Sequence, residues 1–324
     1  MIFVTGGTGL LGNTVIRELL HRGERVAALC RPETSREAFD GLALNLVEGD
    51  LSGRSALSAA VADCSAVIHC AAMIHIGWTR LDASRRVNVE GTRVLAELCV
   101  EHSKRLVHVS TVDTLPAAVD LANPITEAGE GGIAKTPCAY VVSKSEAEEV
   151  VRNYVSERGL DAVILHPGFM LGPNDWKPSS GRMLLEVAKA PMLFLPSGGC
   201  SVCDARDVAH STVEAIQLGQ SGENYILAGR NLSYAEFWRM IRQQAGKSWR
   251  AMRVGPGIRG AMSAFDFAVR TLHLPEGDVN GATLAMGNLN HYYTSDKATQ
   301  ALGYSIRELE TSLADAWNWL QNRQ

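Results

Sequence analysis

Two side chains four residues apart could carry out proton transfer. Tyr140 and Lys144 bound the stretch Tyr140-Val141-Val142-Ser143-Lys144, and this spacing places them on one face of a helix, one turn apart. A free tyrosine titrates near ~10, and a nearby ammonium favours the phenolate and lowers that pKa. The pair therefore predicts a general acid or base for a carbinol or carbonyl oxygen. The alternative interpretation is an amphipathic helix with a packed tyrosine and an exposed lysine.

Two hydroxyl residues close an apolar run about thirty residues before Tyr140. The run over residues 105–110 has the composition of a buried strand, and Ser110 and Thr111 stand at its end. The C-terminal ends of parallel strands form the edge at which such sheets bind ligands. A hydroxyl there can hold the oxygen on which Tyr140 acts, so Ser110 and Thr111 are both candidates.

A glycine-rich turn follows the first apolar run of the chain. A strand over residues 1–5 and a helix over 9–21 are predicted around Thr5-Gly6-Gly7-Thr8-Gly9-Leu10-Leu11-Gly12. Gly6 and Gly7 permit a tight turn, and Gly9 lets the chain approach phosphates closely. Gly12 allows the helix to pack closely on the strand, and the helix N-terminus offers free N–H groups to an anion. This order of elements predicts that the chain binds the pyrophosphate of NAD(P).

The residue after the second predicted strand selects between NAD and NADP. An acidic residue there would bind the ribose 2′-hydroxyl of NAD, whereas an arginine favours the 2′-phosphate of NADP. The strand at 25–30 is followed by Arg31, which predicts NADP, with Arg36 as a second helper. Glu33 lies close enough in the sequence to keep NAD open as an alternative. An exposed loop arginine with no ligand is the structural alternative for Arg31.

Strand and helix signals alternate through the first half of the chain. Strands are predicted at residues 1–5, 25–30, 44–48, 66–70, 105–110 and 161–165, with helices at 9–21, 55–62, 84–101 and 139–158. Strands that alternate with helices form a parallel sheet covered on both faces. The pattern therefore predicts an α/β fold with a doubly wound parallel sheet, the Rossmann fold.

Glycine and proline become frequent after residue 166, which predicts a second, smaller lobe. Helices are predicted at 207–218, from 233 onward with a capping box of Ser233 and Glu236, and at 309–320, with a strand at 222–228. We expect a dinucleotide-binding domain over 1–165, to which 205–230 returns. Residues 166–204 and 231–324 then form a C-terminal substrate-binding lobe.

Composition excludes several classes of partner. The net charge of −4 provides no basic surface for nucleic acid, and no apolar run approaches the ~18 residues that span a bilayer. The seven cysteines are odd in number and scattered, which favours a reducing, cytoplasmic location over a disulfide framework. The first strand begins at Met1, so we expect no signal peptide. Cys200 and Cys203 form a lone CxxC without a second pair, and no metal is expected.

Several ordered motifs together resemble the extended short-chain dehydrogenase/reductase superfamily, also described as the NAD-dependent epimerase/dehydratase superfamily. The segment after the sixth strand resembles the dihydroflavonol-reductase-like branch. The motifs are the glycine turn at 5–12, Gly49-Asp50-Leu51, His69-Cys70-Ala71-Ala72, Asn88, Ser110-Thr111, the Tyr140 to Lys144 stretch, His166-Pro167-Gly168 with Gly172-Pro173, and Arg206-Asp207-Val208-Ala209.

The resemblance implies roles for single residues. Thr111 stands where the family has its catalytic serine and is preferred as the substrate-orienting hydroxyl, with Ser110 kept as the alternative. Asn88 would brace the site or be a helix-surface residue. The implied cofactor-binding residues are the glycine turn, Arg31, Asp50, Leu51, Ala71, Ala72, Asn88, Tyr140, Lys144, His166, Pro167 and Gly168. A homodimer through the helices at 84–101 and 139–158 is also implied.

The leading hypothesis is an NADP-dependent reductase or dehydrogenase that acts on a carbonyl or carbinol of a small apolar substrate. Met73, His75, Phe169 and Met170 are expected to bind that substrate, and the irregular segment 176–192 is expected to form a wall. A nucleotide-sugar epimerase or dehydratase is the second hypothesis, although the aromatic-Asn pair usual in such enzymes is absent. A dinucleotide-sensing protein without catalysis is a remote third, because Tyr140 and Lys144 are intact.

Overall fold

Seven parallel strands form the central sheet of the protein. The computed structural model describes residues 1–253, 255, 271, 276–277 and 280–323. The sheet order is β10-β6-β5-β4-β1-β2-β3. The strands are β1 (Ile2–Thr5), β2 (Val26–Cys30), β3 (Asn45–Glu48), β4 (Ala66–His69), β5 (Arg105–Val109), β6 (Ala162–Pro167) and β10 (Asn224–Leu227). The order reverses between β1 and β4, which is where a doubly wound sheet binds its ligand.

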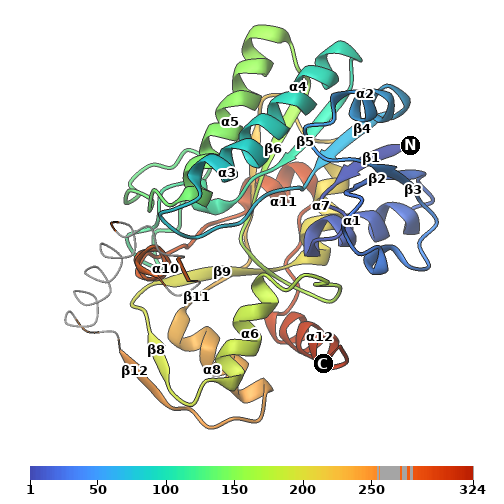
Figure 1. Ribbon diagram of the computed structural model, residues 1–324. Helices are drawn as coiled ribbons and strands as arrows, with labels where there is room; N and C mark the ends of the chain where they lie inside the picture. Colours follow the sequence, from blue (N-terminus) through green and yellow to red (C-terminus); the bar gives the residue numbers. More distant parts are fainter. Residues whose placement is uncertain (254, 256–270, 272–275, 278–279, 324) are drawn as a thin grey trace.

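Helices cover both faces of this sheet, as Figure 1 shows. One face carries α1 (Leu10–His21), α7 (Ala205–Glu214) and α11 (Asp296–Leu302), and the other carries α2 (Arg54–Asp63), α4 (Gly91–Glu101) and α5 (Ala139–Arg158). Each face has its own buried apolar cluster, one with Val15, Ile68 and Val208 and one with Leu57, Leu95 and Val151. The prediction of a doubly wound Rossmann fold is confirmed.

The helix predicted at 84–101 is longer and less regular than the pattern indicated. It begins with α3 (Leu81–Arg85), continues through a π-helical turn over Arg86–Glu90, and ends with α4. The wide turn contains Asn88, which is 2% exposed. The Thr92 hydroxyl donates to the Asn88 carbonyl over 2.6 Å within this region. Single π turns inside helices often occur at functional sites, and this one presents Asn88 to the interior.

A second lobe lies beside the sheet edge that carries the strand ends (Figure 1). It contains β7 (Phe169–Leu171), β9 (Gly199–Asp204) and β11 (Arg230–Ser233) in the order β11-β9-β7. The lobe also contains a parallel pair of short strands, β8 (Leu193–Leu195) and β12 (Ala251–Arg253). Its helices are α6 (Ser180–Lys189), α8 (Tyr234–Gln244), α10 (Gly281–Gly287) and α12 (Leu309–Gln321). The capping box of Ser233 and Glu236 is present at the start of α8.

The segment 176–192 was expected to be irregular, and this expectation is wrong. Residues Ser180–Lys189 form α6, which packs Leu184 and Val187 into the core of the second lobe. The buried guanidinium of Arg242 donates to the carbonyls of Val187, Ala188 and Ala190 and thereby holds the end of α6. In the described part of the chain, no helix is long and apolar enough to cross a membrane.

Candidate active site

The glycine turn lies at the switch point between β1 and β4. Gly6 has a φ of 77°, and a Cβ there would come 2.6 Å from the Ala71 amide nitrogen in the loop after β4. A Cβ on Gly12 would collide with the Gly6 carbonyl oxygen. Gly9 precedes α1 with no side-chain cap, so the N–H groups of the first helical turn remain available to an anion. This side-chain-free cradle fits the pyrophosphate of a dinucleotide.

Arg31 directly follows β2 and is 59% exposed. Its Nε lies 3.4 Å from Oε1 of Glu33, which is itself 68% exposed, so solvent screens this pair strongly. Arg36 forms an ion pair with Glu48 at the end of β3. Arg31 is therefore the less restrained of the two guanidinium groups predicted to meet a 2′-phosphate.

The loop residues named by the resemblance divide into two kinds. Asp50 is exposed after β3, and hydrogen bonds from the hydroxyl and amide of Ser52 lower its carboxyl pKa. Leu51 packs against α4, where a Cβ on Gly91 would lie 2.7 Å from a Leu51 side-chain carbon. After β4, the Ala71 amide lies 3.3 Å from the Thr5 hydroxyl, and Ala72 is exposed. Asp50 and Ala72 are thus open to a ligand, Leu51 is only partly buried, and the cofactor-binding role of all three stays a prediction.

The loop after β4 also holds the start of α5. The Ala139 amide donates to the Gly77 carbonyl over 2.8 Å, and the Tyr140 amide donates to the His75 carbonyl over 3.2 Å. These bonds occupy N–H groups at the start of α5 that lack partners within the helix. Tyr140 is therefore fixed relative to both the glycine turn and the strand edge.

Tyr140 and Lys144 are buried at this edge, with exposed fractions of 9% and 2%. Lys144 Nζ donates to the Val109 carbonyl at the end of β5 over 2.7 Å. Burial lowers the pKa of Lys144 to about 8, while the Glu148 carboxylate acts in the opposite direction. The exposed lysine of the alternative interpretation is therefore wrong.

The pKa of Tyr140 differs from the sequence-based expectation. Burial raises it, the negative charge of Asp113 raises it further, and a hydrogen bond with Thr111 lowers it. We expected a lowered pKa because of the nearby ammonium. In the protein alone, desolvation of the phenolate outweighs any such attraction. Tyr140 is thus held as the neutral phenol, which is the form that donates a proton.

The two candidate hydroxyls after β5 have different partners. Ser110 donates to Glu148, which is buried on α5, and Glu148 also accepts from Arg152 over 2.9 Å. Thr111 caps the short 3₁₀ helix Val112–Thr114 and donates to Asp113 over 3.0 Å. The Thr111 hydroxyl also lowers the pKa of Tyr140, which favours Thr111 as the hydroxyl that acts with it.

Asn88 and His166 are buried residues that hydrogen-bond to the segments carrying the candidate catalytic side chains. The Asn88 amide group donates to the Met73 carbonyl and the Ser143 hydroxyl, and its oxygen accepts from the Met73 amide over 2.7 Å. Asn88 is therefore a brace and not the surface residue of the alternative. His166 is fully buried and bonds to the Thr111 carbonyl over 3.1 Å. Its ring holds the Thr111 turn, so the structure assigns it no open face toward a cofactor.

Pro167 and Gly168 mark the passage from β6 into the second lobe. Pro167 ends β6 and pairs with Leu227, and a Cβ on Gly168 would come 2.6 Å from the Ser201 carbonyl oxygen of β9. Gly168 is thus needed for close approach of the two sheets. Its place as a cofactor-binding residue stays a prediction.

The four predicted substrate residues have different surroundings, and their role in binding stays a prediction. Met73 is half-buried, and His75 bonds to Thr79 and to Glu276, with 3.2 Å between Nε2 and Oε2 in the latter pair. Phe169 packs edge-on against Phe237 in the core of the second lobe. Met170 packs instead against the cluster beside α1 and α7. An apolar group does adjoin Tyr140, formed by Ile76, Trp78, Cys138, Val141, Ala282 and Met286.

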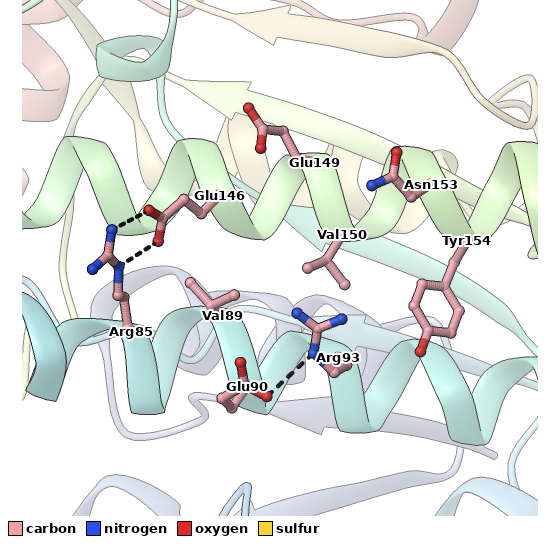
Figure 2. A pocket seen from close by; sticks show the side chains of 9 residues that line it. All are labelled: Arg85, Val89, Glu90, Arg93, Glu146, Glu149, Val150, Asn153 and Tyr154. Carbon is pink, nitrogen blue, oxygen red and sulfur yellow. Dashed lines mark hydrogen bonds and ion pairs between the residues drawn. The ribbon is translucent and has the colours of Figure 1, made fainter.

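A surface groove of about 400 Å³ lies between the helices at 85–93 and 146–154 (Figure 2). Charged side chains border it, with ion pairs between Arg85 and Glu146 and between Arg93 and Glu90. Tyr140 and Lys144 do not line this groove, so it is separate from the candidate active site. It lies on the two helices through which the resemblance implied a dimer.

Several residues of this site were not selected from the sequence. Asn13 donates to the carbonyls of Gly7 over 3.1 Å and Ala38 over 2.7 Å and so fixes the glycine turn. Asp113 and Glu148 hold the two hydroxyls. Glu148 continues the spacing of four from Tyr140 and Lys144, a signal that could have identified it. Cys200 and Cys203 are buried free thiols, and the described residues contain no His, Cys, Asp or Glu group suited to a metal.

Comparison with known proteins places this geometry in a family. Residues 2–228 match the NAD dependent epimerase/dehydratase family. The "Putative dihydroflavonol 4-reductase" of Synechocystis sp. is 29% identical, over 99% of this chain and 94% of that protein. A 4-hydroxy-2-methyl-3-oxo-4-farnesyl-3,4-dihydroquinoline-1-oxide ketoreductase of Stigmatella aurantiaca is 28% identical, over 97% of this chain and 94% of its own.

A solved structure extends the similarity to the whole fold. The crystal structure of gox2253 has a TM-score of 0.83 and 30% identity, and the match covers 100% of this chain and 98% of that one. The family match includes the glycine turn, both hydroxyls and the Tyr140 to Lys144 stretch. The chain therefore belongs to the NAD dependent epimerase/dehydratase family, and it is an NAD(P)-dependent oxidoreductase of the extended short-chain dehydrogenase/reductase type.

Proposed function

We propose that the protein is an NADP-dependent reductase of a ketone or aldehyde with a small apolar body. The observation that carries this proposal is the buried Tyr140 phenol, bonded to the Thr111 hydroxyl and followed one turn later by the buried Lys144 ammonium. Relatives named as reductases support it. The apolar group beside Tyr140 supports a substrate with an apolar body over a sugar diphosphate.

The residues of the chain divide the work of this reaction. The first turn of α1 and the glycine turn hold the pyrophosphate, and the bound cofactor supplies the hydride. Thr111 orients the substrate oxygen, and Tyr140 donates its phenolic proton to that oxygen. Lys144, anchored on the Val109 carbonyl, places a positive charge near the phenolate that this transfer leaves behind.

A single substitution tests this assignment. Tyr140→Phe removes the proton donor, so we expect turnover to fall about 100- to 10,000-fold while NADPH affinity stays unchanged. NADPH oxidation with cinnamaldehyde, acetophenone and ethyl acetoacetate measures turnover, and quenching of protein fluorescence measures binding. Full activity of Tyr140→Phe would refute the mechanism. Conversion of a nucleotide sugar without net NADPH consumption would replace reduction by epimerisation or dehydration.

The two hydroxyls are separated by the same assay. Thr111→Ala removes the hydroxyl that bonds with Tyr140, and we expect a large loss of turnover. Ser110→Ala removes a hydroxyl that donates to Glu148. We expect a smaller loss of turnover, caused mainly by a lower stability of the fold. The reverse order of effects would make Ser110 the orienting residue.

The choice of NADP rests on Arg31, which follows β2 at the place where a 2′-phosphate is read. Arg31→Ala should weaken NADPH binding far more than NADH binding. Arg25→Ala is the matched control, because Arg25 is exposed just before the opposite end of β2. Equal losses for the two cofactors in Arg31→Ala would contradict the assignment.

We also propose that the protein is a cytoplasmic homodimer, with α4 and α5 at the interface. Seven free thiols support a reducing compartment. Arg85 and Arg93 lie on one side of the groove in Figure 2, and Glu146 and Glu149 lie on the other. In a dimer with a two-fold axis, the arginines of one copy would face the glutamates of the other. Sedimentation velocity should give a dimer that Glu149→Arg dissociates, and a monomeric parent protein would contradict this.

A further inference from the structure

The loop after β4 is joined to the second lobe by one buried carboxylate. The side chain of Glu276 is 4% exposed. Its Oε1 accepts from the Trp78 amide over 3.0 Å, and its Oε2 accepts from the Thr79 amide over 3.0 Å and from the Thr79 hydroxyl over 2.7 Å. Nε2 of His75 lies 3.2 Å from the same Oε2. Both oxygens of the carboxylate therefore bind the loop at residues 75–79, and the proposed function does not use this contact.

Asn280 makes a second bond across the same junction. Its Nδ2 donates to the Ile76 carbonyl over 2.9 Å, and its Oδ1 accepts from the Thr283 amide over 3.0 Å and so caps α10. A Cβ on Gly77 would collide with Oε2 of Glu276, so any larger residue there displaces the carboxylate. The loop at 75–79 and the start of α10 are thus fixed against each other.

The other side of this loop is fixed to the helix that carries Tyr140. The carbonyls of His75 and Gly77 accept from the first two amides of α5, which belong to Tyr140 and Ala139. These backbone bonds do not involve Glu276. The loop therefore has two separate anchors, α5 on one side and the second lobe on the other.

Between these anchors the loop carries apolar side chains beside Tyr140. Ile76 and Trp78 are partly buried and pack against a cluster that contains Tyr140, Ala282 and Met286. Ala282 and Met286 belong to α10, so the loop and the second lobe together form this apolar wall. Such a wall suits a hydrocarbon body, and its position beside the phenol decides which bodies fit.

We propose that Glu276 is a positioning residue that selects substrates with a bulky apolar body, because it holds Ile76 and Trp78 in place beside the proton donor. This inference rests on the proposed function, in which Tyr140 protonates the oxygen of such a substrate. Without the carboxylate, the loop stays attached to α5 but loses its bonds to the second lobe. The chemistry of Tyr140 then continues, whereas the wall no longer matches the apolar body.

A comparison of two aldehydes tests this role. Glu276→Gln keeps the size of the side chain but replaces one acceptor oxygen by an amide group that faces N–H donors. NADPH oxidation with cinnamaldehyde and with propanal measures the selectivity, since propanal has almost no apolar body. For cinnamaldehyde we expect kcat/KM to fall about 10-fold or more, mainly through KM. For propanal both constants should stay close to those of the parent protein.

Four matched variants accompany this comparison. Thr79→Val removes the hydroxyl that donates to Glu276 and should lower the selectivity in the same direction, whereas Thr79→Ser keeps this hydroxyl and should retain the parent ratio. Gly77→Ala should also lower the ratio, because the added methyl group displaces the carboxylate. Glu157→Gln changes an exposed carboxylate at the far end of α5 and should have no effect.

Hydrogen exchange gives a readout that needs no substrate. The Trp78 and Thr79 amides donate to the carboxylate, so in Glu276→Gln their exchange should become about 10-fold faster or more. Exchange in β6, which does not contact the loop through these bonds, should stay unchanged. An equal acceleration in β6 would indicate a general loss of stability and would overturn the role of Glu276, as would unchanged exchange at Trp78 and Thr79.

The kinetic outcomes separate this inference from the proposed function. Equal losses for cinnamaldehyde and propanal in Glu276→Gln, or no loss for either, would overturn the inference. A parent protein without a preference for cinnamaldehyde over propanal would overturn it as well. A fully active Tyr140→Phe would reject the proposed function, whatever the ratio in Glu276→Gln.

Discussion

Replacement of Lys144 by methionine should reveal the energetic cost of the buried ammonium. Methionine has a similar length and no charge, so it fills the same space between α5 and β5. Burial lowers the pKa of Lys144 from 10.5 to about 8. A difference of this size corresponds to about 3 kcal/mol that folding must spend on keeping the lysine charged at neutral pH. Lys144→Met should abolish turnover without the loss of stability that a buried-site substitution normally causes.

The sign of the pH dependence makes this prediction specific. Between about pH 8 and 10.5 the unfolded chain keeps the lysine proton and the folded chain releases it. The free energy of unfolding of the parent protein should therefore rise with pH in this window, relative to Lys144→Met. Below pH 8 both states hold the proton, and the difference between the two proteins is constant.

Urea denaturation of the cofactor-free proteins at several pH values measures this difference. The parent protein should gain up to about 3 kcal/mol on Lys144→Met between pH 7 and pH 10.5. Lys189→Met is the control, because Lys189 is exposed at the end of α6. The difference in unfolding free energy between the parent protein and Lys189→Met should not change with pH. If the difference for Lys144→Met is also independent of pH, or falls with pH, the claim that the buried charge of Lys144 destabilises the folded protein is refuted.

Three further substitutions test the support of the site. Gly12→Ala would place a Cβ against the Gly6 carbonyl, so the free energy of unfolding should fall by about 1–3 kcal/mol. NADPH affinity should fall as well in a fluorescence titration, and an unchanged affinity would contradict the cradle. Asn88→Ala removes three hydrogen bonds and should cost about 2–3 kcal/mol of unfolding free energy, whereas Asn153→Ala at the surface groove should cost little. Arg242→Met leaves the carbonyls that end α6 unpaired and should cost about 3 kcal/mol with the Tyr140 chemistry retained. A loss of chemistry greater than the loss of folded protein would show that α6 shapes the active site.

Local patterns in the sequence were sufficient for the sheet and for its ligand-binding edge. Parallel strands buried on both faces are short apolar runs, and the predicted run at 105–110 lies within one residue of β5. The helix predicted at 139–158 has the observed bounds of α5. The steric requirement of Gly12 is equally local, because its Cβ would meet Gly6, whereas a Cβ on Gly6 would meet Ala71 in the loop after the adjacent strand β4.

The missing parts of the prediction depend on contacts between distant segments. Asp113 meets His291, and His75 meets Glu276, across long separations in the sequence that no periodicity encodes. The expected lowering of the Tyr140 pKa failed for a related reason. It considered the ammonium one turn away, whereas the desolvation that dominates comes from burial of the phenol, to which the distant residues Ala282 and Met286 contribute.

The buried face of α5 explains why the charge on Lys144 survives at all. Tyr140, Lys144 and Glu148 follow one another at intervals of four residues and all point into the protein. Desolvation alone would drive the ammonium toward the neutral amine, and the carboxylate of Glu148 opposes this. Glu148 also takes the Ser110 hydroxyl, which leaves Thr111 to bond with Tyr140. One acidic residue thus maintains the positive charge of the site and separates the roles of the two hydroxyls.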